Sequence, residues 1–96
     1  MLNRAVHPGD ILKDELEERS VSPASFARQI DVPANRISQI LAGKRAATGD
    51  SALRFGHWFG MDPQFWLNLQ AQYDLALAEE LVGAKIRVLP TAAGAE

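Results

Sequence analysis

Signals that start and stop helices divide the first eighty residues of this chain into five segments. The second segment opens at Ser22-Pro23, a capping serine followed by the proline favoured at the first helical position. The third stops at Gly43, because glycine enters the left-handed conformation at little cost. The fourth starts at Thr48, which suits an N-cap, and stops before Gly60. Apolar residues recur within the segments at three- and four-residue steps, so we expect an all-α fold.

The five expected helices form one compact domain with a tail. The first opens near Pro8-Gly9-Asp10, the third covers about 33–42, and the fifth runs from 63 to about 81. We place the domain at 1–82 and expect 83–96 to be a short flexible tail with at most a short strand. A chain of 96 residues has room for one core of modest stability, which oligomerisation can supplement.

Composition narrows the class of protein. The chain has no cysteine, which excludes disulfides and thiolate metal sites and fits a reducing compartment. Neither a signal peptide nor an apolar run of roughly 20 residues is visible, so we expect a cytoplasmic protein without a membrane partner. His7 and His57 lack the carboxylate pairs or ligand spacing of a catalytic or metal site, and no nucleotide-binding loop is present. We expect no enzymatic activity, cofactor, metal or small-molecule substrate, and interpret His7 as structural or surface and His57 as partly packed.

The charge of the chain is unevenly distributed. The net charge is -2, which alone argues against a nucleic-acid-binding domain. Between residues 28 and 54, however, there are five basic residues and only two acidic ones. This stretch therefore has a net charge of +3, and the remainder of the chain has a net charge of -5. A basic middle on an acidic body is suited to holding phosphate at one face and a cationic partner at another.

The third segment carries the polar chemistry. At 100° per residue its apolar residues, Ala34, Ile37, Ile40 and Leu41, share one arc that must pack inward. The opposite side and its flank hold amide, hydroxyl and guanidinium groups, from Asn35, Arg36, Ser38 and Gln39. Amide side chains can pair bidentately with adenine in the major groove, and the following Lys44 and Arg45 suit phosphate contact. An ordinary solvated helix face is the alternative interpretation.

The second and third segments together resemble a helix-turn-helix motif over residues 22–43. Small Ala27 is expected where two helices cross closely, and the break of about four residues after it is typical of the motif. Asp31 occupies the turn position where most such motifs place glycine with positive φ, which aspartate tolerates better than most residues. The start of the second helix, at Ser22, Ala24 and Ser25, offers N–H groups to a phosphate, and plain capping is the alternative interpretation.

Several motifs in order along residues 6–80 resemble one known family. They are His7-Pro8-Gly9-Asp10-Ile11-Leu12, the stretch from Ala27 through Gly43-Lys44-Arg45, Ala52-Leu53-Arg54, and the run DPQFWLNLQAQYDL from Asp62 to Leu75. On these residues the chain resembles the HigA-type antitoxins, also called the VapI group, among the lambda-repressor-like (XRE) helix-turn-helix proteins. The opening motif and the FWLNLQ segment are more specific than the helix-turn-helix alone.

The resemblance implies a partner set that residue chemistry alone does not reach. It implies a lambda-repressor-like fold and a homodimer that binds a palindromic operator in double-stranded DNA and represses its own operon. It also implies a toxin partner of the HigB type, a small basic RelE-like ribonuclease that cleaves mRNA, which the antitoxin neutralises. Some members of the family act as stand-alone regulators without a toxin.

The fifth segment has more apolar surface than one domain needs. One stripe is expected to cover the four shorter helices, and consists of Trp66, Leu69, Tyr73, Ala76 and Leu77. Four apolar residues lie off that stripe and are our candidates for a dimer interface, namely Phe65, Leu67, Leu75 and Leu81. A position central to the monomer is the alternative.

Two further interpretations stay open. The acidic cluster Asp14, Glu15, Glu17 and Glu18 suits a solvated face or a docking surface for a basic toxin. The amide face of the third helix also suits a protein partner, which would make the chain a helical protein-interaction module.

Overall fold

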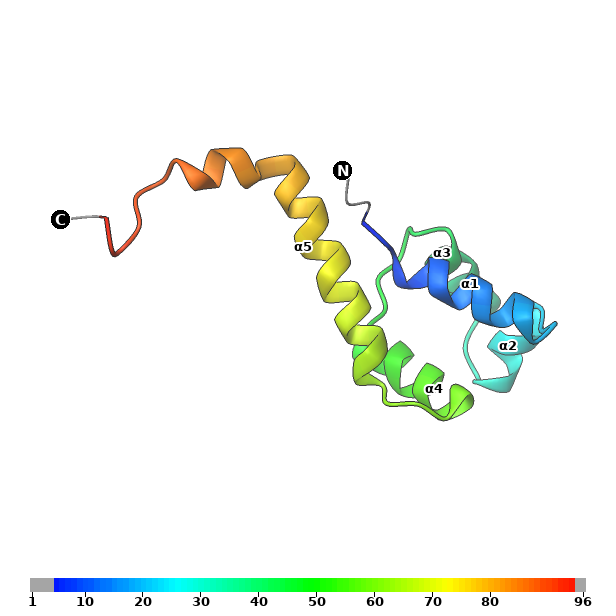
Figure 1. Ribbon diagram of the computed structural model, residues 1–96. Helices are drawn as coiled ribbons and strands as arrows, with labels where there is room; N and C mark the ends of the chain where they lie inside the picture. Colours follow the sequence, from blue (N-terminus) through cyan, green and yellow to red (C-terminus); the bar gives the residue numbers. More distant parts are fainter. Residues whose placement is uncertain (1–4, 95–96) are drawn as a thin grey trace.

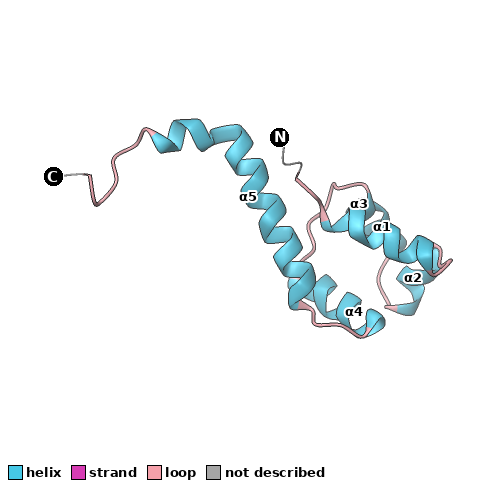
Figure 2. Ribbon diagram, viewed as in Figure 1, coloured by secondary structure: helices cyan, strands magenta, loops and turns pink. Residues whose placement is uncertain are grey.

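Five α-helices and no strand make up residues 5–94, the part of the chain that this computed structural model describes (Figures 1 and 2). The helices are α1 Pro8–Glu18, α2 Pro23–Gln29, α3 Ala34–Leu41, α4 Gly49–Phe59 and α5 Gln64–Arg87. The predicted all-α class and the order of the five helices are confirmed. Within these residues no helix is both long and apolar enough to cross a membrane.

Side chains expected to cap helices do so. Ser22 accepts a hydrogen bond from the Ser25 N–H at 3.1 Å, and Thr48 caps α4 in the same way. His7 is buried and caps α1, because its Nδ1 accepts from the Gly9 N–H at 2.9 Å while Asp10 accepts from the His7 backbone N–H. His7 is therefore structural. His57 was predicted to be partly packed, but it lies exposed on α4 because its position faces away from the core.

The first three helices end in the same type of turn. In each turn a residue in the left-handed conformation follows the helix, with φ of 56° at Ser20, 59° at Asp31 and 74° at Gly43. The next N–H then reaches back to a carbonyl five residues earlier, as from Val32 to Ala27 at 3.0 Å. The positive φ predicted for Asp31 is confirmed, and a left-handed residue lets the chain change direction directly after each of these three helices.

Each helix contributes at least one large, fully buried apolar side chain to a single core. These side chains are Leu12, Phe26, Ile37, Phe55 and Trp66, from α1 to α5 in order, all 0% exposed. The Phe55 and Trp66 rings meet edge to face with centroids 5.1 Å apart. Because every helix inserts one such residue, none can be removed without opening the core.

Helix α5 is longer than predicted. It was expected to end near Leu81, but it continues to Arg87 and includes Gly83. Glycine costs only about 1 kcal/mol inside a helix, and its helix-favouring neighbours outweigh that cost. Only residues after 87 remain non-helical in the predicted tail, up to residue 94. Figure 1 shows α1 to α4 gathered at one end and the second half of α5 leaving them, consistent with extents of 57 × 24 × 22 Å.

Candidate nucleic-acid interface

Helix α3 is anchored by its aliphatic side chains. Ile37 and Ile40 are fully buried, and Ala27 of α2 is 1% exposed where the two helices pack. The predicted inward arc is confirmed for these residues and for Leu41, which packs against the core from a partly buried position. It is wrong for Ala34, which is exposed because it is the first residue of the helix and projects beyond the core.

The opposite side of α3 presents the predicted polar groups. Asn35 and Ser38 are exposed, and Gln39 is half-buried one turn after Asn35. The Ser38 hydroxyl donates to the backbone carbonyl of Asn35 at 3.2 Å. The side-chain amide of Asn35 takes no part in that bond. Lys44 and Arg45 are exposed directly after the helix. The structure therefore places two amides, a hydroxyl and two cations along one short stretch of surface.

The serines at the start of α2 already have hydrogen-bond partners within the helix. The Ser25 N–H is donated to the Ser22 hydroxyl, and the Ser25 hydroxyl accepts from Gln29 at 3.0 Å. Both serines therefore have a capping or intrahelical role already. A phosphate that used the Ser25 N–H would have to displace the Ser22 hydroxyl from it.

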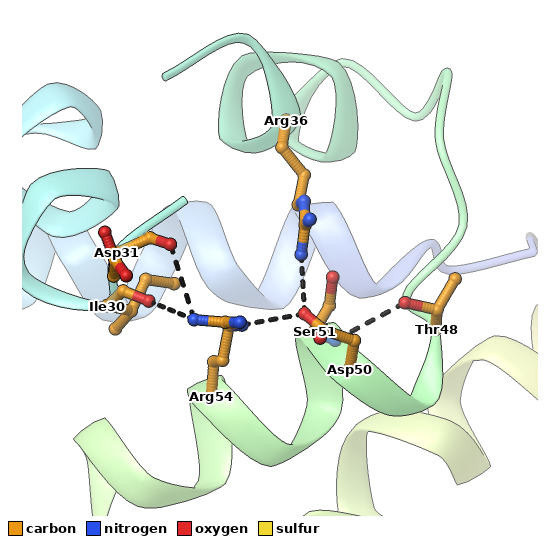
Figure 3. A network of polar contacts seen from close by, with 7 residues as sticks. All are labelled: Ile30, Asp31, Arg36, Thr48, Asp50, Ser51 and Arg54. Carbon is orange, nitrogen blue, oxygen red and sulfur yellow. Dashed lines mark hydrogen bonds and ion pairs between the residues drawn. The ribbon is translucent and has the colours of Figure 1, made fainter. Parts of the chain in front are cut away.

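Arg36 differs from the other predicted contact residues because it points toward α4. Its guanidinium donates to the Asp50 carboxylate at 2.7 Å, and its side chain is 26% exposed (Figure 3). The Asp50 carboxylate also accepts from the Arg54 Nε at 2.7 Å. In the structure Arg36 thus joins α3 to α4, and its use for a base or phosphate would require this ion pair to break.

Arg54 extends the same network to the helix-turn-helix turn. Its Nη1 donates to the Ile30 carbonyl at 2.8 Å and approaches the Asp31 carbonyl at 3.4 Å (Figure 3). These carbonyls follow the end of α2, where no further helical N–H can satisfy them. Arg54 therefore clamps the turn that sets the crossing of α2 and α3. This role was not predicted, because Ile30 and Asp31 are more than twenty residues away from Arg54 in the sequence.

The Asp50 network predicts a pH-dependent contribution to stability. Hydrogen bonds from Arg54 first, and then Arg36, hold the pKa of the Asp50 carboxyl below its ordinary value. A lowered folded-state pKa stabilises the protein above the unfolded-state pKa of about 3.9, and this contribution is lost as the pH falls through the folded-state pKa. We expect Asp50→Asn to lower the melting temperature at pH 7 and to lose that difference toward pH 2. Glu80→Gln, which removes an exposed carboxylate from α5, is the control for each melt. An equal deficit at both pH values would contradict the prediction.

The predicted dimer residues on α5 have unequal surroundings. Leu75 and Leu81 are 72% and 70% exposed, and Phe65 is 39% exposed with its ring edge to face against Trp66. Leu67 instead packs, partly buried, against the core of its own chain. Its interface role is therefore the least supported of the four, because α5 turns that position toward α1 to α4.

The geometry has close counterparts among known proteins. No protein-family model matches the chain. Virulence-associated protein I of Dichelobacter nodosus is 43% identical over 77 residues, which cover 79% of this chain and 71% of the relative. A HigA-family addiction module antidote protein from Coxiella burnetii has a TM-score of 0.88 and 42% identity, covering 93% of this chain and 100% of that one. The Pseudomonas aeruginosa antitoxin HigA, solved with the higBA promoter, has a TM-score of 0.88 and 40% identity, covering 93% and 99%. Likeness of both sequence and fold over most of each protein shows that the chain belongs to the HigA family of helix-turn-helix antitoxins.

Proposed function

We propose that the protein binds double-stranded DNA by inserting α3 into the major groove. The observation that carries this proposal is the division of α3 into a buried aliphatic side and an outward side bearing Asn35, Ser38 and Gln39. Amides on such a helix can read adenine, and a serine hydroxyl can contact any base. Lys44 and Arg45 follow at the helix end, where they would contact phosphates. The Pseudomonas aeruginosa relative was solved with the higBA promoter, which supports DNA binding by this chain.

The DNA-binding form we propose is a homodimer on a palindromic operator, which would repress the operon of the protein. Support comes from α5, whose second half extends beyond α1 to α4 and leaves Leu75, Leu81 and Ile86 exposed. Large apolar side chains exposed in this number on one helix are typical of a surface that contacts a partner. Two copies related by a two-fold axis would place their recognition helices about 34 Å apart, on successive major grooves.

The toxin partner is proposed from the family. The relatives of this chain include an addiction module antidote protein and proteins named as antitoxins. We therefore propose that this chain neutralises a RelE-like ribonuclease of the HigB type. A stand-alone regulator would use the same DNA-binding residues. Co-purification of a small basic ribonuclease encoded beside this protein supports the antitoxin function, and an isolated gene supports the regulator.

Salt dependence tests the DNA-binding proposal and separates it from a protein-interaction module. The logarithm of operator affinity should fall with the logarithm of salt concentration, with a slope of about -0.9 per phosphate neutralised. We expect Lys44→Ala or Arg45→Ala to weaken binding to all sequences alike and to reduce the slope by about 2, because each copy in the homodimer loses one phosphate contact. Lys85→Ala, on the far part of α5, is the matched control for loss of one cation. Fluorescence anisotropy with promoter and random duplexes measures both effects, and a chain that binds no promoter DNA at low salt would exclude the proposal.

A further inference from the structure

A buried glutamine on α5 contacts the segment between α3 and α4. The Gln70 side chain lies in the protein interior, and the whole residue is 9% exposed. Its Oε1 accepts from the Ala47 N–H at 2.8 Å, across 23 residues of sequence. Its Nε2 donates to the Asp74 carboxylate at 3.0 Å, one turn further along α5. Both ends of the amide are therefore engaged, and Asp74 fixes which end faces Ala47.

The segment that Gln70 contacts also carries the two exposed cations. Residues 44–48 connect α3 to α4 and are not helical. Within the described chain the backbone of this segment is tied at its start by the Lys44 N–H to Gln39, and at its end by the Thr48 cap of α4. The Ala47 N–H is the tie between these two points, and Ala47 itself is 3% exposed. Loss of this tie would leave a buried N–H without its partner, so the segment would have to move toward water.

We propose that Gln70 is a positioning residue for phosphate contact, acting through the segment that carries Lys44 and Arg45. This inference rests on the proposed function, since it assumes that these two side chains contact DNA. The hydrogen bond from Ala47 to Gln70 sets where the segment lies relative to α5. Asp74 holds the amide in register, so the tie joins the phosphate-contacting end of the recognition unit to the long helix.

Three substitutions separate the hydrogen bond from the bulk of the side chain. Gln70→Met keeps the length of the side chain but removes its strong hydrogen-bond acceptor. Gln70→Glu keeps the acceptor for the Ala47 N–H but sets two carboxylates against each other at Asp74. The double variant Gln70→Glu/Asp74→Asn keeps the acceptor and restores a donor from the other side. Gln72→Met changes an exposed glutamine of the same helix and is the matched control.

Affinity of the full-length protein for promoter and random duplexes, over a range of salt concentrations, is the measurement. For Gln70→Met we expect about tenfold weaker binding to both duplexes and a salt slope reduced by about 1 to 2, with the promoter-to-random ratio unchanged. The double variant should recover the slope, and Gln72→Met should retain it. In a Lys44→Ala/Arg45→Ala background, Gln70→Met should have no further effect on the slope, because the residues through which it acts are gone.

Several outcomes would overturn the inference. The inference is wrong if folded Gln70→Met has the same salt slope as the wild-type protein. It is also wrong if this variant loses its preference for the promoter while its salt slope is unchanged, because that would indicate a disturbed recognition helix. If Gln70→Met does not fold by circular dichroism, failure of the double variant to restore the slope lost in Gln70→Glu overturns it. If the wild-type protein binds DNA but the Gln70 variants do not change its salt slope, the inference about Gln70 is wrong and the proposed function still stands. If the wild-type protein binds no DNA, both are wrong.

Discussion

Replacing Gly9 with alanine is expected to destabilise the whole domain. Gly9 lies at the start of α1, directly against the last turn of α3. An added Cβ would overlap the carbonyl group of Ile40, lying 2.8 Å from its carbon, and would lie 3.1 Å from the Leu41 Cα. These neighbours are backbone atoms, so rotation of a side chain cannot relieve the overlap, and α1 must move away from α3. We expect a loss of about 3 kcal/mol or more in the free energy of unfolding, seen as a melting temperature lower by roughly 15 °C.

Gly49→Ala is the matched control for this prediction. Gly49 is also near the start of a helix, α4, but an added Cβ there has no neighbour within 4 Å. Alanine is favoured over glycine in helices, so this variant should be as stable as the parent or slightly more stable. Equal melting temperatures for Gly9→Ala and the parent would show that α1 and α3 are not pressed together as the structure has them. This contact also explains the residue types of the opening His-Pro-Gly motif. The histidine caps α1, and the glycine lets the backbone of α3 pack directly against α1.

Local signals made most of the fold predictable. Caps at Ser22 and Thr48, and left-handed residues at Asp31 and Gly43, act through atoms within a few residues of themselves, so sequence shows them directly. The buried side of α3 follows from its periodicity for the same reason. The end of α5 was harder to predict, because Gly83 is a stop signal only if the neighbouring helix formers do not outweigh it.

Contacts between distant residues could not be predicted from the same reasoning. Arg36 and Asp50 are 14 residues apart, and Arg54 and Ile30 are 24 apart, so periodicity within one helix gives no sign of either hydrogen bond. The Arg36 pair is the instructive case. Its residue type suited DNA contact, and only the packing of α3 beside α4 shows that the guanidinium already has a partner. Gln70 is similar, because neither its burial nor its partner at Ala47 was predicted, and both follow only from the fold.

Replacing Gln39 with alanine should have the largest effect on promoter recognition. Gln39 lies on the outward side of α3, and a bidentate amide contact to a base contributes about 1–3 kcal/mol of discrimination. A homodimer loses this contact twice, so we expect about 2–6 kcal/mol, or roughly thirtyfold to twenty-thousandfold weaker promoter binding. Random duplexes should bind as before, because phosphate contacts carry no sequence information. Parallel titrations of both duplexes measure the ratio.

The length of the duplex turns the same variant into a test of the dimer. On a duplex that carries one half-site, only one copy of α3 can reach its bases, so Gln39→Ala should cost about 1–3 kcal/mol instead of the doubled value. Gln64→Ala, which removes an exposed amide at the start of α5, should leave both duplexes unaffected. An unchanged ratio of promoter to random binding would place Gln39 outside the groove. If Gln39→Ala instead loses the same binding free energy on the half-site and on the full promoter, only one copy contacts the bases. This follows because the loss is proportional to the number of recognition helices in the groove.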